Sequence, residues 1–210
     1  MLQSLPAARR ALMALGIASL AACHVVTDKE LADIRSQGQH KGPDAAKMLS
    51  DQLIPYADKQ AKPAAQVIGA LNQNFDDACK QYGFRQSNAF PCNFWLRVQG
   101  KVTKVDDTSR VGKTYVEVAP VSGADPVQVV LETGPVVIGT GVRDGFPGVK
   151  YSDFDDQTRF AAFGQELNKL VVSKAQSTKL KVGDSVDVAA VYSSWSEPTG
   201  EIRAIPVAWK

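Results

Sequence analysis

The order in which hydrophobic patterns follow one another is the feature that most constrains the fold of this chain. Apolar residues repeat with a helical period up to Tyr82, and they alternate with polar residues from position 94 onward. The elements expected after that point are strands at 94–105, 114–119 and 127–133, a helix with an apolar stripe over 160–171, and strands at 185–192 and 202–209. This order predicts an α+β fold containing an OB-like five-stranded β-barrel with one helix between strands 3 and 4. Another small mixed α/β fold is the alternative.

The segment before the barrel is expected to form a helical hairpin. Its first helix should bend or end at Pro55, and its second should begin near Pro63 and end at Gly83. We therefore divide the mature chain into a helical subdomain at 44–92 and a barrel domain at 93–210. The barrel helix is expected to plug one end of the barrel, and residues 136–140 are expected to form a bent or separate strand.

The N-terminal sequence is typical of a bacterial lipoprotein signal. Arg9 and Arg10 precede an apolar stretch at 11–20, which is shorter than the roughly 20 residues that span a bilayer. The sequence Leu-Ala-Ala-Cys at 20–23 matches a lipobox, so we expect a signal peptide at 1–22 and lipidation of Cys23. An ordinary secretory signal or a short buried helix is the alternative.

Lipidation predicts where the protein resides. Two or three acyl chains hold a protein durably on a membrane, whereas one does so only marginally. We therefore expect a periplasm-facing protein of the cell envelope, with residues 23–43 as a tether. His24 follows Cys23 in place of the aspartate that retains enteric lipoproteins at the inner membrane, which favours the outer membrane over the inner.

The charge of the mature chain argues against nucleic acid as a partner. Only Arg9 and Arg10 are charged in the expected signal peptide, so its removal leaves equal numbers of basic and acidic residues. A formally neutral chain has no overall field that attracts polyanions.

Two cysteines remain after Cys23 in a chain that enters an oxidising compartment. A disulfide between Cys79 and Cys92 would close a loop of about 14 residues, which stabilises by roughly 3 kcal/mol in the chain-entropy model. Two free thiols in the core are the alternative. A structural zinc site needs four ligands, and the only histidines are His24 and His40, so we expect no metal and no other cofactor.

No motif in the chain predicts catalysis. Gly112-Lys113-Thr114 ends like a phosphate-binding loop, but Asp107 stands where its first glycine is required. No histidine follows His40, so a nucleophilic triad is not expected. A hydrolytic carboxylate pair could come only from a small acidic set, which helix capping and solvent exposure also explain: Asp144, Asp153, Asp155, Asp156 and Glu166. We therefore expect a protein that is not an enzyme.

One polar group stands out as a candidate contact for a ligand or a partner. Arg143 and Asp144 lie between a glycine-broken segment and the long helix, where a loop could direct them into a cleft, and Asn168 lies on that helix. An internal ion pair that locks the loop to the helix is the alternative. The three tryptophans could stack on a sugar ring, although buried aromatic residues are commoner in strands.

Several stretches together resemble an uncharacterised family of predicted periplasmic lipoproteins, domain of unknown function 2291. The residues that carry the resemblance are Thr133-Gly134-Pro135-Val136, Gly139-Thr140, Val142-Arg143-Asp144, Tyr151-Ser152-Asp153-Phe154 and Val182-Gly183-Asp184-Ser185-Val186. The resemblance covers residues 20–208. It implies a helical subdomain joined to an OB-like barrel and a link to sugar uptake, because such genes often lie beside ribose-type sugar ABC transporters. It implies no catalytic residues.

Two functions follow as hypotheses. The first is a non-catalytic, lipid-anchored accessory protein that binds a partner protein, with components of a sugar ABC transporter as the candidates. The second is a module that binds a sugar or another small metabolite on the face of the barrel near Arg143, Asp144 and Asn168.

Overall fold

The computed structural model describes residue 27 and residues 42–120 and 126–210. The expected signal peptide at 1–22, the lipidation site Cys23 and, apart from residue 27, the tether up to residue 41 lie outside the described residues. Within the described part of the chain, no helix has both the length and the apolar character needed to cross a membrane.

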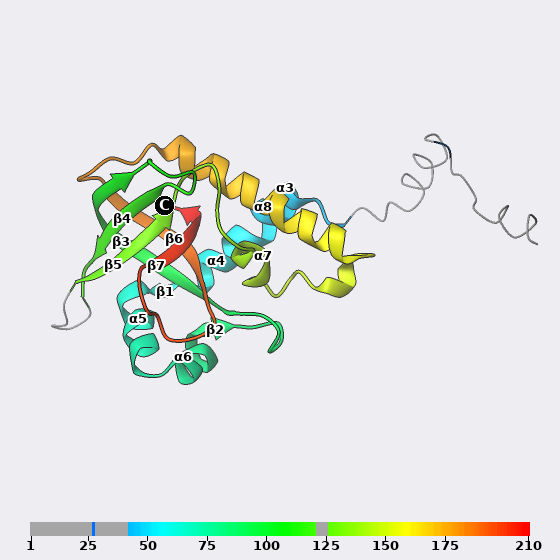
Figure 1. The fold of residues 1–210 in the computed structure, drawn as a ribbon, viewed down its shortest axis with the longest axis horizontal. Coiled ribbons are helices and arrows are strands. Elements are labelled where there is room, and N and C mark those ends of the chain that lie inside the picture. Colours follow the sequence, from blue (N-terminus) through cyan, green and yellow to red (C-terminus); the bar gives the residue numbers. More distant parts are fainter. Residues whose placement is uncertain (1–26, 28–41, 121–125) are drawn as a thin grey trace, which may run out of the picture. The chain divides into compact units, whose positions relative to one another are not determined.

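Helices and strands follow one another in the predicted order (Figure 1). The helical elements are α3 (Ala45–Met48), a π-helical turn (Leu49–Leu53), α4 (Ile54–Gln60), α5 (Ala64–Gln73), α6 (Phe75–Tyr82), α7 (Gly141–Asp144), a 3₁₀ turn (Tyr151–Asp153) and α8 (Gln157–Thr178). The strands are β1 (Lys62–Pro63), β2 (Gly83–Phe84), β3 (Cys92–Asp106), β4 (Lys113–Val118), β5 (Val127–Glu132), β6 (Ser185–Ser194) and β7 (Ile202–Trp209).

Five of these strands form a closed sheet. Strands β3, β4, β5, β7 and β6 are neighbours in that order, and β6 pairs again with β3 to close the ring. The β5–β7 pairing is parallel, whereas the other pairings within the ring are antiparallel. The short strands β1 and β2 add to β3 outside this ring. The predicted α+β fold with an OB-like five-stranded barrel is confirmed.

Helices α5 and α6 pack against the interior of the closed sheet. Alternate residues of all five strands belong to one hydrophobic cluster, and the buried residues of α5 and α6 belong to the same cluster. These residues include Val67 and Leu71 on α5, Phe75 on α6, and Phe94 and Leu96 on β3. Helix α8 was expected to plug an end of the barrel, but four of its buried residues lie in a different cluster: Phe160, Phe163, Leu167 and Val171. This part of α8 therefore covers the outside of the barrel and does not plug its end.

A second hydrophobic cluster lies on the outer face of the sheet. It joins the opposite faces of β3, β6 and β7 to the segment from α3 to α4 and to α7 and α8. Trp95 on β3 and Val191 on β6 meet Leu53, Phe163 and Leu167 of the helices in this cluster. Side chains point to alternate faces of a strand, so β3 and β6 are buried on both sides.

The helices before the barrel differ from the prediction at two places. The first helix continues through Pro55 to Gln60, and the π-helical turn directly before Pro55 is where it departs from regular geometry. The second predicted helix is two helices, because Asn74 is extended and its side chain accepts a hydrogen bond from the backbone N–H of Asp77 at 2.9 Å. Asn74 is therefore the N-cap of α6, and it divides the apolar stripe of the predicted helix between α5 and α6.

The strand expected at 136–140 does not form. These residues belong to no helix or strand, and the short helix α7 follows them. The backbone N–H of Ile138 donates to the side chain of Glu132 at 2.8 Å rather than to a neighbouring strand. The backbone N–H of Val136 donates to the carbonyl of Arg110 at 3.1 Å, so a side chain and a loop carbonyl hold this segment in place of a sheet ladder.

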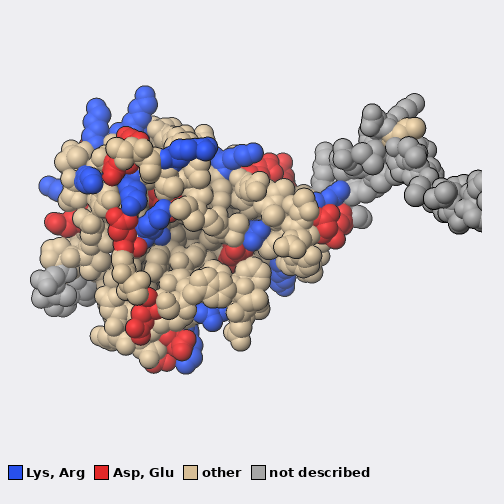
Figure 2. Space-filling model, in the orientation of Figure 1, with Lys and Arg blue, Asp and Glu red and all other residues tan. Residues whose placement is uncertain are grey.

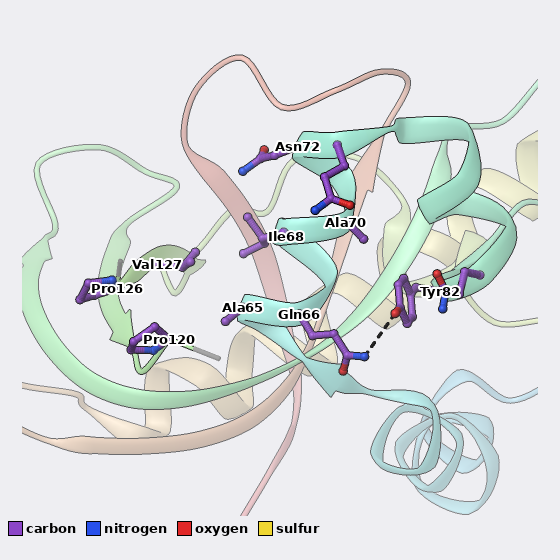
Figure 3. A pocket seen from close by; sticks show the side chains of 12 residues that line it. Ala65, Gln66, Ile68, Ala70, Asn72, Tyr82, Pro120, Pro126 and Val127 are labelled. Carbon is purple, nitrogen blue, oxygen red and sulfur yellow. Dashed lines mark hydrogen bonds between the residues drawn. The ribbon is translucent and has the colours of Figure 1, made fainter. Parts of the chain in front are cut away.

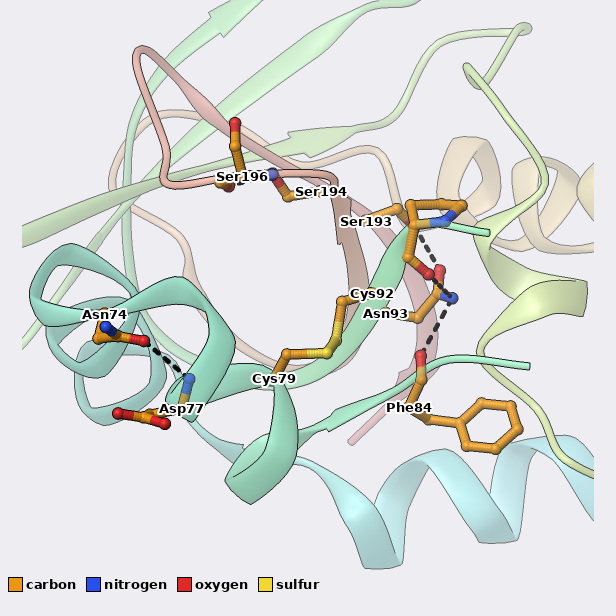
Figure 4. Close-up of a disulfide and its surroundings, with 10 residues drawn as sticks. Asn74, Asp77, Cys79, Phe84, Cys92, Asn93, Ser193, Ser194 and Ser196 are labelled. Atoms are coloured by element: carbon orange, nitrogen blue, oxygen red, sulfur yellow. Dashed lines mark hydrogen bonds between the residues drawn. A yellow bond between two sulfur atoms is a disulfide. The ribbon is translucent and has the colours of Figure 1, made fainter. Parts of the chain in front are cut away.

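The predicted disulfide is present and fixes the start of β3 (Figure 4). Cys79 on α6 joins Cys92, with 6.1 Å between the two Cα atoms. Gly83 passes so close that a Cβ there would overlap the Cys92 sulfur, so the crossing requires glycine. The buried amide of Asn93 donates to the carbonyls of Phe84 and Pro91 and accepts from Ser193 Oγ at 2.7 Å.

The described residues from 42 onward belong to one compact unit, in which the helices of 44–92 share both hydrophobic clusters with the strands. Figure 2 shows basic and acidic side chains on the same face of this unit. The division into a helical subdomain at 44–92 and a barrel domain at 93–210 stays a prediction.

Loss of the disulfide is expected to lower stability without changing the fold. The bond closes a short loop, so replacing Cys79 and Cys92 with alanine should lower the free energy of unfolding by about 3 kcal/mol. Urea unfolding with and without reductant measures this change. Reductant should shift the wild-type midpoint and leave that of the double variant unchanged, and equal shifts in both proteins would contradict the assignment.

Candidate functional site

Arg143 and Asp144 form a buried ion pair. Their exposed fractions are 6% and 4%, and Arg143 Nε donates to Asp144 Oδ1 at 2.7 Å. Arg143 Nη1 also donates to the carbonyl of Phe160 at 2.8 Å, and the guanidinium lies 3.6 Å from the centre of the Phe160 ring. Asp144 accepts a further bond from Thr140 Oγ1. The pair therefore joins α7 to α8.

Gly164 leaves space on helix α8 for the Arg143 side chain. A Cβ at Gly164 would lie 3.2 Å from Arg143 Nη1, so glycine allows the close approach. Asn168, one turn further on, donates from Nδ2 to the carbonyl of Gly139 at 2.8 Å, while its buried Oδ1 has no hydrogen-bond partner among the described residues. The structure thus brings all three predicted contact residues together, with most of their polar atoms bonded to protein. Direct contact with a ligand stays a prediction.

The tryptophans and the acidic residues lie in different surroundings. Trp95 is buried and donates to the carbonyl of Gly145 at 2.8 Å, whereas Trp195 is 61% exposed on the β6–β7 hairpin. Asp156 caps α8, and Asp153 accepts a bond from the backbone of Lys150. Among the described residues, no group of three His, Cys, Asp or Glu side chains lies close enough to hold a metal ion.

The largest cavity among those described here is an open groove of about 600 Å³ beside α5, which we call the α5 groove (Figure 3). Its lining comes from α5, from the end of α6, and from the ends of β4 and β5: Ala65, Gln66, Ile68, Gly69, Ala70, Asn72, Gln73, Gln81, Tyr82, Pro120, Pro126 and Val127. None of these residues is charged. Gln66 Nε2 donates to Tyr82 Oη at 3.2 Å, and Asn72, Gln73 and Gln81 make no side-chain hydrogen bond within the described structure. The groove therefore offers free amide groups beside apolar walls.

A second, more polar cavity lies on the outer face of β5, β6 and β7, and we call it the β5–β7 pocket. It has a volume of about 260 Å³ and is lined by Glu132, Ile138, Val191, Tyr192, Ser193, Glu201, Arg203 and Ile205. Glu132 is only 4% exposed; it accepts from Arg203 Nη2 at 2.9 Å and from the Ile138 backbone. Glu201 accepts from Lys113 Nζ at 2.6 Å and from Tyr115 Oη at 3.0 Å.

The two carboxyl groups of this pocket have opposite electrostatic settings. Burial raises the pKa of Glu132, although the Ile138 N–H and the Arg203 guanidinium act to lower it. The hydrogen bond from Lys113 lowers the pKa of Glu201, and the same bond raises the pKa of Lys113. Carboxyl groups with a raised and a lowered pKa at one cavity are typical of functional sites, although structural ion pairs also shift pKa values in this way.

The α5 groove and the β5–β7 pocket are not predicted by any sequence pattern discussed above. The available signal for the pocket was Glu132, a charge at the end of the apolar strand pattern 127–131. Its partner Arg203 lies on a strand 71 residues away, and only the parallel β5–β7 pairing brings the two together.

The buried pair predicts a large loss of stability when one partner is removed. Arg143→Met leaves the Asp144 carboxylate buried without its cation, which typically costs 3–5 kcal/mol. Lys80→Met breaks the exposed Lys80–Asp77 pair and should change stability by less than about 1 kcal/mol. Chemical denaturation of both variants measures the difference, and equal small effects would contradict a locking role for Arg143.

The raised pKa of Glu132 predicts a pH-dependent effect of its replacement. Between its ordinary value near 4.5 and its higher native pKa, the folded protein holds a proton that the unfolded chain releases, so this group lowers stability as pH rises. Glu132→Gln should therefore gain stability relative to wild type as pH rises through that window. The gain is about 1.4 kcal/mol per unit of pKa shift. Urea unfolding from pH 4.5 to 7.5 measures it, and a difference that is constant with pH would overturn the assignment.

Comparison with solved structures supports the fold. The chain is similar to an OB-fold protein from Thermotoga maritima, with a TM-score of 0.61 and 21% sequence identity over 81% of this chain and 99% of the other. At this identity the likeness establishes the fold alone. None of the curated proteins matches the sequence significantly.

A family model described as a predicted periplasmic lipoprotein, domain of unknown function 2291, matches residues 13–210. The match covers nearly the whole chain, including the segment that sequence analysis assigned to the end of the signal peptide and the lipobox. The chain therefore belongs to this family of predicted periplasmic lipoproteins, domain of unknown function 2291.

Proposed function

We propose that this protein is a non-catalytic, lipid-anchored accessory protein that faces the periplasm and acts by binding a partner protein. The lipobox at 20–23 and the family support the anchor at Cys23 and the periplasmic side. The absence of any histidine after His40 supports binding rather than acid–base catalysis. His24 after Cys23 favours the outer membrane over the inner.

The α5 groove is the observation that carries this proposal. Its free amide side chains at Asn72, Gln73 and Gln81 offer donors and acceptors in pairs, which match the N–H and C=O groups of a polypeptide backbone. Ile68 on α5 and Pro120 and Pro126 across the groove supply apolar walls (Figure 3).

The lining of the groove also supports one kind of occupant. An uncharged groove gives no attraction to a highly charged segment, and tyrosine and proline walls suit an extended chain. The occupant that fits is an extended, uncharged segment of a partner protein. We propose a component of a sugar ABC transporter, or its substrate-binding protein, as that partner; the support for this choice is the family resemblance and its link to sugar uptake.

Site-specific crosslinking in the native envelope tests this proposal. A photoreactive amino acid at Asn72 or Gln73 places the probe in the groove, and the same amino acid at Gln165, exposed on α8, is the matched control. All three variants keep Cys23 and are expressed in the native bacterium. We expect the same transporter component to be captured from both groove positions and not from Gln165.

Two outcomes would contradict the proposal. Recovery of the uncrosslinked protein alone from all three variants would show that the groove has no protein occupant. Equal capture of one protein from Gln165 and from the groove would show a contact that does not depend on the groove.

A further inference from the structure

The β5–β7 pocket has a balanced set of charges. Glu132 is paired with Arg203, and Glu201 is paired with Lys113. An anionic ligand would meet both carboxylates, and a cationic ligand would meet the Arg203 guanidinium. The pocket therefore favours a ligand without net charge.

Hydrogen-bonding capacity remains after the internal contacts are counted. Each oxygen of Glu132 and of Glu201 accepts one bond, although a carboxylate has about four lone-pair positions. Ser193 Oγ donates to Asn93 and keeps its acceptor positions. Arg203 donates to Glu132 from Nη2 only, and no other partner for its guanidinium lies in the described part of the chain. Hydroxyl groups, which both donate and accept, match this mixture of free donors and acceptors.

Apolar side chains complete the lining. Ile138 is 58% exposed beside the pocket, and Val191 and Ile205 form part of its wall. Tyr192 on β6 is the aromatic residue of the lining. Apolar and aromatic surface beside polar groups suits a ring with hydroxyl groups on its edge and C–H bonds on its face.

The volume limits the size of the ligand. At about 260 Å³ the pocket lies just below the range of roughly 300–1,000 Å³ that is typical of drug-sized ligands. We propose that the β5–β7 pocket binds a neutral, polyhydroxylated molecule of the size of one monosaccharide. This site is separate from the α5 groove and does not rest on the proposed partner interaction.

Calorimetric titration of the acylated protein in detergent micelles tests this inference, with a panel of neutral aldopentoses and aldohexoses as probes. The matching uronic acids and amino sugars are the charged comparison compounds. We expect saturable binding of at least one neutral sugar, and at least tenfold weaker binding of its charged counterparts. The same sugar should raise the melting temperature of the protein in proportion to its occupancy.

Three variants localise the binding. Glu132→Gln keeps the shape of the pocket, and Ile138→Ala removes an exposed side chain of the lining whose loss should not affect folding. Each should weaken binding about tenfold. Tyr151→Ala removes another exposed side chain, on the 3₁₀ turn and outside the pocket lining, and should leave binding unchanged.

Three results would overturn the inference. One is the absence of saturable binding across the neutral panel. Another is binding that persists unchanged in both Glu132→Gln and Ile138→Ala. The third is equal binding of neutral and charged sugars, because the charge balance of the pocket would then play no part.

Discussion

Strand β3 is the element on which the rest of the structure depends, because it is buried on both faces. Phe94 and Leu96 face the interior of the closed sheet and contact the cluster that contains α5 and α6. Trp95 and Arg97 face outward, where Trp95 packs edge-on against Tyr56 and Arg97 forms an ion pair with Asp58, both on α4. A strand with two apolar faces needs cover on both sides, so one set of helices packs against the inward-facing side chains and another set packs against the outer face.

The helices that cover the outer face of the sheet do not extend the outer hydrophobic cluster to β4 and β5. No described residue of these two strands belongs to the outer hydrophobic cluster, which uses only β3, β6 and β7. Polar side chains such as Lys113, Glu132 and Arg203 therefore lie near this side of the ring and pair with one another or with Glu201. The β5–β7 pocket lies where the covered and the uncovered parts of the sheet meet. The α5 groove likewise lies at an edge, where α5 and α6 meet the segments that follow β4 and precede β5.

The sequence was sufficient for features that depend on local periodicity. Alternation predicted all five strands of the ring to within a few residues, and the even number of cysteines predicted the disulfide. It failed where one side chain redirects the backbone, as Asn74 does by capping α6 and Glu132 by binding the N–H of Ile138. The candidate sites were harder to predict than the strands. The sequence left open whether Arg143 and Asp144 contact a ligand or form an internal ion pair, and packing against Phe160 buries them. The Glu132–Arg203 pair forms because β5 and β7 are parallel neighbours, which local sequence patterns do not reveal.

We propose that the anchored, non-catalytic barrel supports sugar uptake by binding a partner protein. Uptake of a labelled ribose-type sugar in a deletion strain of the native bacterium tests this proposal, with complementation by wild type, by Cys23→Ala and by a variant with Asn72 and Gln73 replaced by lysine. We expect uptake to fall on deletion, to return with wild type, and not to return with either variant at equal protein level. Unchanged uptake in the deletion strain would contradict it.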